Sequence, residues 1–87
     1  LNELRQPVIS FNSQASYVKY KLYRVEQSTH TLIGWVMGES GKTLSITDST
    51  ADSGEHSYYI LPEHNDAYRH GLPLTGKISQ IVNISVP

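Results

Sequence analysis

The sequence contains no cysteine, no long apolar segment and no excess of one charge, and each of these absences excludes a class of protein. Without cysteine the chain can form no disulfide, and it offers neither a thiol nucleophile nor a cysteine-ligated zinc site. No apolar segment approaches the roughly 20 residues that a transmembrane helix needs, so we expect no membrane span. Seven Lys and Arg residues are balanced by eight Asp and Glu residues. We therefore expect no basic surface that would bind nucleic acid.

Signatures of catalysis and metal binding are also missing. The glycine-rich run GESGK at residues 38–42 has neither the order of a nucleophile elbow nor the length of a phosphate-binding loop. His64, Asp66 and His70 share one polar segment, but their spacing matches no common set of metal ligands. From the residues we predict no enzymatic activity, no metal site and no cofactor.

The remaining ionisable candidates fit structural roles better than chemical ones. Asp48 with Asp52, and Glu63 with Asp66, are pairs of carboxylates in turn-like sequence, where Asp and Glu are common because they are soluble and cap backbone groups. His56 occupies an alternating position in a strand-like segment. We predict solvated carboxylates in the turns and a packed or half-buried histidine.

Length and composition indicate one small folded domain. The chain has 87 residues, of which 38% are hydrophobic and 17% charged, a mixture that suits a single modest core better than disorder. We expect one domain over residues 1–87. Because the chain starts at Leu1 without Met, we also expect it to be one module of a longer polypeptide.

Apolar residues that recur at every second position predict strands throughout. The clearest segment is 17–25, where Tyr20 and Leu22 are predicted to share the core face with Val18 and Arg24. Strands are also predicted at residues 8–11, 32–37, 43–47, 56–61 and 77–86, the last with a bulge near Ser79 and Gln80. Turn-rich segments separate them, no helical pattern appears, and residues 63–76 are expected to form a loop. The pattern predicts an all-β, antiparallel β-sandwich of about six to seven strands.

The segment around residues 44–62 contains two strands joined by a corner. Residues 47–54 are almost entirely Thr, Asp, Ser, Ala and Gly, which favours a turn. Tyr58 follows Gly54 by four positions and is in line with His56 and Ile60. We therefore predict that the Tyr58 ring faces the core, whereas Tyr59 faces outward.

Three aromatic residues are candidates for a binding surface. Tyr23 and Tyr59 fall on the outer faces of their strands, while Trp35 follows Gly34, a residue that can mark a bulge, so its ring could lie on either face. If the three strands are neighbours in one sheet, these rings could form a platform on which sugars stack, with Lys19, Lys21 or Asn65 offering hydrogen bonds. Alternatively, the rings cover the sheet or pack against an adjoining domain.

From Tyr20 to Ile60, the runs YKLYR, LIGW, ITDSTA and SGEHSYYI resemble the middle and later strands of fibronectin type III-like and bacterial Ig-like modules. The resemblance implies strands C, C′, E, F and G at residues 17–25, 32–37, 43–47, 56–61 and 77–86. Only residues 1–16 remain for strands A and B, so the first strand or strands would be short, displaced or lost. The residues that this resemblance assigns to the core, the corner and the turn are Tyr20, Leu22, Asp48, Ala51, Gly54 and Tyr58. It also implies a hydrogen bond from the Tyr58 hydroxyl to the backbone a few residues upstream.

Similar modules occur in multidomain secreted bacterial glycosidases, metallopeptidases and adhesins. The resemblance thus implies a non-catalytic accessory module, acting as spacer, support or docking surface in a secreted or cell-surface bacterial protein. Its partners would be neighbouring domains of the same polypeptide, with a glycan or a host surface protein as further candidates. The alternative function is a carbohydrate-binding module that uses Tyr23, Trp35 and Tyr59.

Overall fold

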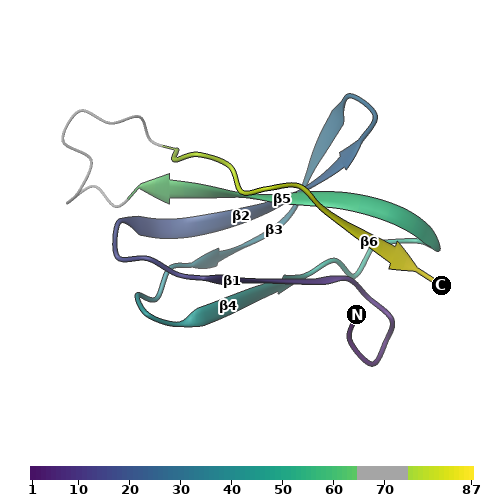
Figure 1. Ribbon diagram of the computed structural model, residues 1–87, viewed down its shortest axis with the longest axis horizontal. Coiled ribbons are helices and arrows are strands. Elements are labelled where there is room, and N and C mark those ends of the chain that lie inside the picture. Colours follow the sequence, from purple (N-terminus) through teal and green to yellow (C-terminus); the bar gives the residue numbers. More distant parts are fainter. Residues whose placement is uncertain (65–74) are drawn as a thin grey trace.

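The computed structural model describes residues 1–64 and 75–87, and these residues form six β-strands and no helix (Figure 1). The strands are β1 (Val8–Asn12), β2 (Tyr17–Glu26), β3 (Thr29–Met37), β4 (Thr43–Thr47), β5 (Gly54–His64) and β6 (Val82–Val86). The prediction of an all-β chain is confirmed over the described residues. No apolar helix of membrane-spanning length occurs among them.

Two antiparallel sheets face each other in a sandwich-like arrangement. One sheet consists of β1 and β4, and the other has the order β3-β2-β5-β6 (Figure 1). The small sheet contributes Ile9 and Ile46 to the core. The large sheet contributes Tyr20, Leu22, Tyr58 and Ile60, at alternating positions of the two central strands β2 and β5. Period-two alternation therefore determines which side chains are removed from water.

A bulge in β3 changes which face its residues occupy. Leu22 pairs with Gly34, but Tyr23 pairs with Leu32, so Ile33 is an extra residue with no partner on β2. As a result, Ile33 and Val36 both pack against the core although they are three positions apart. The same shift puts Leu32 and Trp35 together on the outer face. The position of Trp35, left open by the sequence, is therefore outward.

Strand β5 continues through Pro62, although we predicted that the strand would end at residue 61. Pro62 pairs with Tyr20, but its carbonyl points away from β2 and accepts a hydrogen bond from Gly76 N at 2.8 Å. Its missing N–H is therefore on the side where no β2 carbonyl needs a donor. Glu63 and His64 belong to β5 rather than to the predicted loop, and residues 65–74 of that loop lie outside the described residues.

The last predicted strand is shorter than expected. Only Val82–Val86 pair with β5, whereas residues 77–81 run beside β5 without a regular ladder. Ser79 is the point of contact: its N donates to Ile60 O at 2.9 Å and its Oγ accepts from Ile60 N at 2.8 Å. The predicted irregularity near Ser79 is present, but instead of a bulge within a longer strand it is a break in the pairing, and the regular ladder covers only Val82–Val86.

The close approach of Gly38 to the start of β2 gives a test of this packing. A Cβ on Gly38 would lie 2.6 Å from the Tyr17 carbonyl oxygen, whereas a Cβ on Gly34 would meet only Ile46 Cγ2, at 3.4 Å. Gly38→Ala should therefore cost on the order of 1–3 kcal/mol through backbone displacement, and Gly34→Ala should cost less. Urea denaturation of both variants measures the difference. A smaller loss for Gly38→Ala than for Gly34→Ala would contradict this packing.

Candidate functional site

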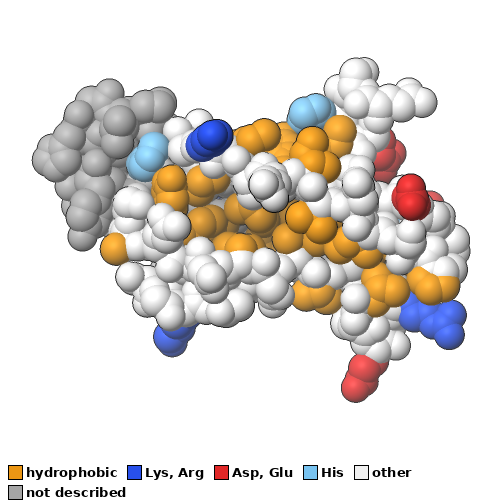
Figure 2. All heavy atoms as spheres, viewed as in Figure 1, with side chains coloured by type: hydrophobic (Ala, Val, Ile, Leu, Met, Phe, Trp, Pro, Cys, Tyr) orange, Lys and Arg blue, Asp and Glu red, His pale blue; other side chains and the backbone are white. Residues whose placement is uncertain are grey.

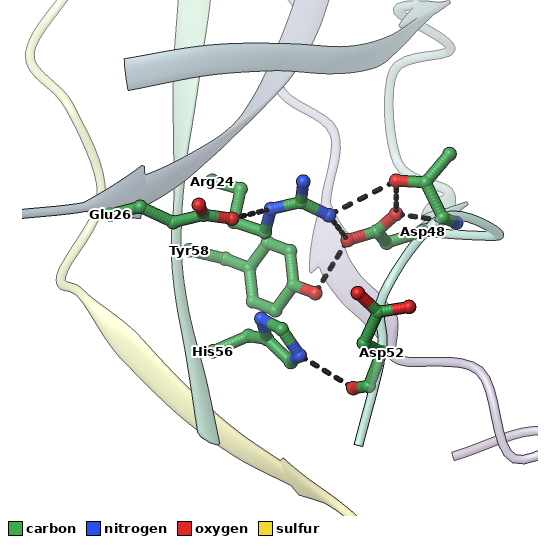
Figure 3. A network of polar contacts seen from close by, with 7 residues as sticks. Arg24, Glu26, Asp48, Asp52, His56 and Tyr58 are labelled. Atoms are coloured by element: carbon green, nitrogen blue, oxygen red, sulfur yellow. Dashed lines mark hydrogen bonds and ion pairs between the residues drawn. The ribbon is translucent and has the colours of Figure 1, made fainter. Parts of the chain in front are cut away.

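Two groups of side chains stand out as candidate sites. The first, which we call the inter-sheet polar cluster, consists of Arg24, Asp48, Thr50 and Tyr58 and joins the two sheets, with Asp48 and Tyr58 buried and Thr50 exposed (Figure 3). The second is the aromatic group on the outer face of the large sheet, where the sequence places Tyr23, Trp35 and Tyr59. Each is built from strands that are distant in the sequence.

Asp48 is the acceptor at the centre of the inter-sheet polar cluster. It follows β4 directly and is 0% exposed. Its Oδ1 accepts from the Thr50 backbone N–H at 2.9 Å and from Thr50 Oγ1 at 2.6 Å, which closes a local turn two residues on. Its Oδ2 accepts from Tyr58 OH at 2.7 Å and from Arg24 Nη1 at 2.8 Å, both from the opposite sheet (Figure 3). Four donors thus satisfy this buried carboxylate.

Arg24 provides the positive charge that a buried carboxylate requires. It lies on β2 in register with Tyr58, on the core face where we predicted it. Nη1 also donates to Thr50 Oγ1 at 3.0 Å. Nε lies 2.6 Å from Glu26 Oε1, an ionic contact without the alignment of a hydrogen bond. The guanidinium therefore connects the buried Asp48 to the exposed end of β2.

These contacts shift the pKa values of all three groups. Burial alone would raise the pKa of Asp48, but hydrogen bonds from Thr50, Tyr58 and Arg24 outweigh it and lower the pKa to about 2. Burial raises the pKa of the Tyr58 hydroxyl, and its bond to the carboxylate raises it further. Burial would lower the pKa of Arg24, but the hydrogen bond to Asp48 more than compensates and raises it. At neutral pH Asp48 and Arg24 are therefore ionised and paired, while the Tyr58 hydroxyl keeps its proton and donates it to the carboxylate.

The geometry of the cluster indicates a structural role. Tyr58 and Asp48 are both 0% exposed, so no substrate atom can reach the carboxylate or the phenol. Two expectations need correction: the acceptor of the Tyr58 hydroxyl is the Asp48 side chain rather than the backbone, and Asp48 is buried rather than solvated. The physical reason is Arg24 on β2, whose positive charge offsets the cost of removing the carboxylate from water. His56 Nε2 donates separately to the Asp52 carbonyl at 2.7 Å (Figure 3).

On the outer face, Tyr23 and Tyr59 lie on adjacent strands and their rings stack. The ring centroids are 5.3 Å apart with an interplanar angle of 12°. His30 Nδ1 lies 2.8 Å from Tyr59 OH, and its ring meets Tyr59 edge-on. Tyr59 is therefore only 9% exposed. It lies on the outer face, as predicted, but it is covered by neighbours from β2 and β3 and is not open to solvent.

Trp35 lies on the same face but apart from this stack. It pairs with Lys21 in the strand register, and Lys21 Nζ forms an ion pair with Glu63 Oε1 at 2.8 Å. The hydrogen bond to Glu63 raises the pKa of Lys21. Lys19 Nζ lies over the Trp35 ring, 4.5 Å from its centroid. Trp35 is 53% exposed, so the sheet joins two of the three candidate rings and leaves the third as a separate exposed ring. Asn65, considered as a hydrogen-bond donor there, lies outside the described residues.

The other candidates from the sequence do not come together within the described part of the chain. No three His, Asp, Glu or Cys side chains gather there in a way that could hold a metal ion. His64 lies against Tyr17, with ring centroids 5.2 Å apart, while Asp66 and His70 are outside the described residues. Comparison with protein-family models, curated proteins and solved structures gives no match.

Substitutions at the two adjacent tyrosines should separate their roles. Tyr58→Phe removes one of four donors from a buried carboxylate and should cost about 1–3 kcal/mol, while Tyr58→Ala should cost about 3–5 kcal/mol because of the cavity. Tyr59→Phe loses only the bond to the exposed His30 and should cost less than Tyr58→Phe. Tyr59→Ala should cost about 1–3 kcal/mol because the stack with Tyr23 is lost. Urea denaturation measures the unfolding free energies of all four variants. Equal losses for the two Phe variants would contradict the assignment of Tyr58 to the buried polar cluster and of Tyr59 to the outer face.

Stability should fall in acid because Asp48 has a lower pKa in the folded state. The stabilisation from Asp48 is fully present above its unfolded-state pKa near 3.8, and it is lost as the pH falls through its folded-state pKa of about 2. The shift corresponds to about 2 kcal/mol. Unfolding free energies measured from pH 6 to pH 2 should therefore fall more steeply for the wild type than for Asp48→Asn. Asp52→Asn, at an exposed position, is the control, and identical slopes for all three proteins would exclude the proposed linkage.

Proposed function

We propose that this chain is a non-catalytic accessory module, similar to fibronectin type III-like and Ig-like modules, within a larger secreted or surface bacterial protein. The strand pairing supports this proposal. In such a module, the pairs β1–β4 and β3-β2-β5-β6 would take the places of strands B–E and C′–C–F–G. No strand pairs with the free edge of β1 in the described part of the chain, which agrees with a first strand that is short, displaced or lost.

The observation that carries the functional proposal is an apolar strip on the outer face of β3, which we call the β3 strip. It consists of Leu32, Trp35 and Met37, which are 47%, 53% and 52% exposed. The bulge at Ile33 brings these three side chains onto one face of an edge strand. Contiguous exposed apolar side chains are a feature of interaction sites, and Trp and Met are enriched at protein interfaces. We infer that the β3 strip packs against a neighbouring domain of the same polypeptide.

The interior of the molecule supports a docking role over a catalytic one. The polar groups with shifted pKa values inside the sandwich, Asp48 and Tyr58, are fully buried and hydrogen-bonded to one another. On the outer face, Lys21 pairs with Glu63 and Tyr23 stacks on Tyr59, so these four side chains already have partners within the sheet. Among the described side chains of the outer face, those of the β3 strip remain about half exposed. An exposed apolar strip on an edge strand suits a surface for domain contact.

Exposure of Trp35 favours a second candidate, a carbohydrate-binding module. An indole ring that is half exposed and beside Lys19 can stack on a sugar ring while the ammonium group donates hydrogen bonds. Tyr59 contributes little to such a platform, because Tyr23 and His30 cover it. This candidate therefore rests on a single ring.

Footprinting of the β3 strip tests the proposed function. The chain has one Trp and one Met, and both side chains react readily with hydroxyl radicals. In the full-length protein that contains this chain, oxidation of Trp35 and Met37 should be several-fold slower than in the isolated 87 residues, because a neighbouring domain covers them. Leu4, 77% exposed in the N-terminal turn, is the internal control. Equal oxidation rates in the two proteins, or a full-length protein without another domain, would contradict the docking role.

Titration of the isolated chain with soluble polysaccharides separates the two candidates. Because Trp35 is the sole tryptophan, its emission reports directly on ring stacking. A module that only docks to a neighbouring domain should show no saturable change in Trp35 emission and no heat of binding in calorimetric titration. Because Trp35→Ser removes the fluorophore, this variant is compared with the wild type by calorimetry, and a saturable heat of binding that Trp35→Ser abolishes would instead establish the carbohydrate-binding function.

A further inference from the structure

The two flanks of the sandwich differ. Along one flank, β3 and β4 approach each other, and a Cβ on Gly34 would lie within 3.4 Å of Ile46 Cγ2. The other flank, which we call the open flank, is bounded by β1 on one side and by residues 75–82 on the other. No strand pairing joins these two boundaries. Figure 2 shows hydrophobic side chains gathered in a band across this face, between β5 and β1 of Figure 1.

The edge of β1 offers unpaired backbone groups to the open flank. At the two ends of the β1–β4 ladder, Pro7 O accepts from Asp48 N and Ser13 N donates to Lys42 O. Backbone groups of every second residue between them therefore point toward β4. The N–H and C=O groups of Val8, Ser10 and Asn12 point the other way, where no strand of the described chain pairs with them.

Beside this edge is a cavity of about 230 Å³ with an apolar floor. Phe11, Tyr20 and Ile60 form the floor, and the Phe11 and Tyr20 rings are in contact, with centroids 4.8 Å apart. Ser79 and Lys77 line the cavity on the side of residues 75–82. Lys77 is exposed and has no ion-pair partner among the described residues. The open flank thus combines a backbone edge, an apolar cavity and one positive charge to which no described residue supplies an ion-pair partner.

We propose that the open flank binds an extended peptide segment of another polypeptide, which adds a strand to the free edge of β1. An extended backbone is the complement of the unpaired groups at Val8, Ser10 and Asn12. An apolar side chain at an alternate position of the peptide fills the cavity over Phe11 and Tyr20, and a carboxylate of the peptide pairs with Lys77. The ligand is therefore a strand-forming peptide with alternating apolar residues and an acidic residue near one end.

A second copy of this chain fits the open flank less well. Its own β1 contains no acidic residue to pair with Lys77, and its inward apolar side chains Ile9 and Phe11 are already packed in its core. Edge pairing between two β1 strands would satisfy the backbone groups but leave the cavity and the charge without partners. We therefore assign the occupant to a different polypeptide.

The probe is a synthetic eight-residue peptide that alternates Val and Thr and ends in Asp. It should bind saturably to the ¹⁵N-labelled 87-residue chain, with amide shifts and slowed hydrogen exchange at Val8, Ser10 and Asn12. Replacing its Asp with Lys should weaken binding about two- to fivefold, the worth of one exposed ion pair. N-methylation of its alternate amides should weaken binding at least about tenfold, because the edge hydrogen bonds are lost. The peptide variants leave the protein unchanged, so misfolding cannot explain these losses.

The Lys77→Glu variant is the matched test on the protein side. It should reverse the order of affinities, so that the Lys-ended peptide binds better than the Asp-ended one. The proposal is overturned if neither peptide binds, or if the protected amides belong to the free edges of β3 or β6. It is also overturned if the chain alone dimerises with protection at Val8, Ser10 and Asn12, which would identify a second copy as the occupant.

Discussion

The buried carboxylate of Asp48 is the constraint on which the arrangement of the two sheets depends. A carboxylate removed from water is costly unless charges and hydrogen-bond donors replace its hydration. Here the donors come from both sides of the sandwich: Thr50 from the same corner, and Arg24 and Tyr58 from the large sheet. Any displacement of one sheet relative to the other would remove donors while the charge stayed buried. The polar cluster therefore fixes the relative position of the sheets at this end of the molecule.

At the opposite end, neutral hydrogen bonds perform the equivalent task. Ser13, which is buried, follows β1 and accepts from Glu39 N through its Oγ at 2.9 Å. Tyr20 OH accepts from Gln14 N at 2.8 Å. These bonds tie the turn after β1 to the turn after β3 and to the core tyrosine of β2. Each is worth less than the contacts of a buried charge, so most of the specificity of the packing is expected at the Asp48 end.

The functional proposals follow from what this rigid interior leaves exposed. One feature is the β3 strip, on an edge strand of the large sheet, and the other is the open flank beside β1. The two surfaces belong to different edges of the sandwich, so one partner could occupy each without displacing the other. An accessory module with two such surfaces can hold one domain in place while it binds an extended segment of a second protein.

Alternation along single strands predicted most of the buried core, because this information is local, but it was wrong at the start of β2. Val18 was predicted on the core face, yet Tyr17 packs against the core in its place, because the register with β5 shifts between Tyr17 and Lys19. Tyr20, Leu22, Tyr58 and Ile60 all face inward in the structure, at the positions where period two placed them. Arg24 was also placed on the core face, but its partner Asp48 could not be identified. That pairing depends on how the corner after β4 meets β2, which is a long-range property of the fold.

Features that depend on strand register were beyond the sequence. Tyr59 is covered because the pairing of β2 with β5 and β3 brings Tyr23 and His30 against it, and neither contact can be derived from its own strand. Gly34 suggested a bulge in this strand but not at which residue, and the face that Trp35 occupies depends on where the bulge lies. Pro62 was predicted to end the strand because proline has no backbone N–H. Whether that missing donor faces β2 or points away from it depends on the register as well, which the sequence does not show.

A double-mutant cycle on Asp48→Asn and Tyr58→Phe tests most directly whether the carboxylate couples the two sheets. Unfolding free energies of the wild type, the two single variants and the double variant should be measured in urea at neutral pH. If Tyr58 donates to the buried carboxylate across the sandwich, the cycle should give a coupling energy of about 1 kcal/mol or more. Losses that add within about 0.5 kcal/mol would mean that the two side chains act independently, and the account of a carboxylate that fixes the sheets would be wrong.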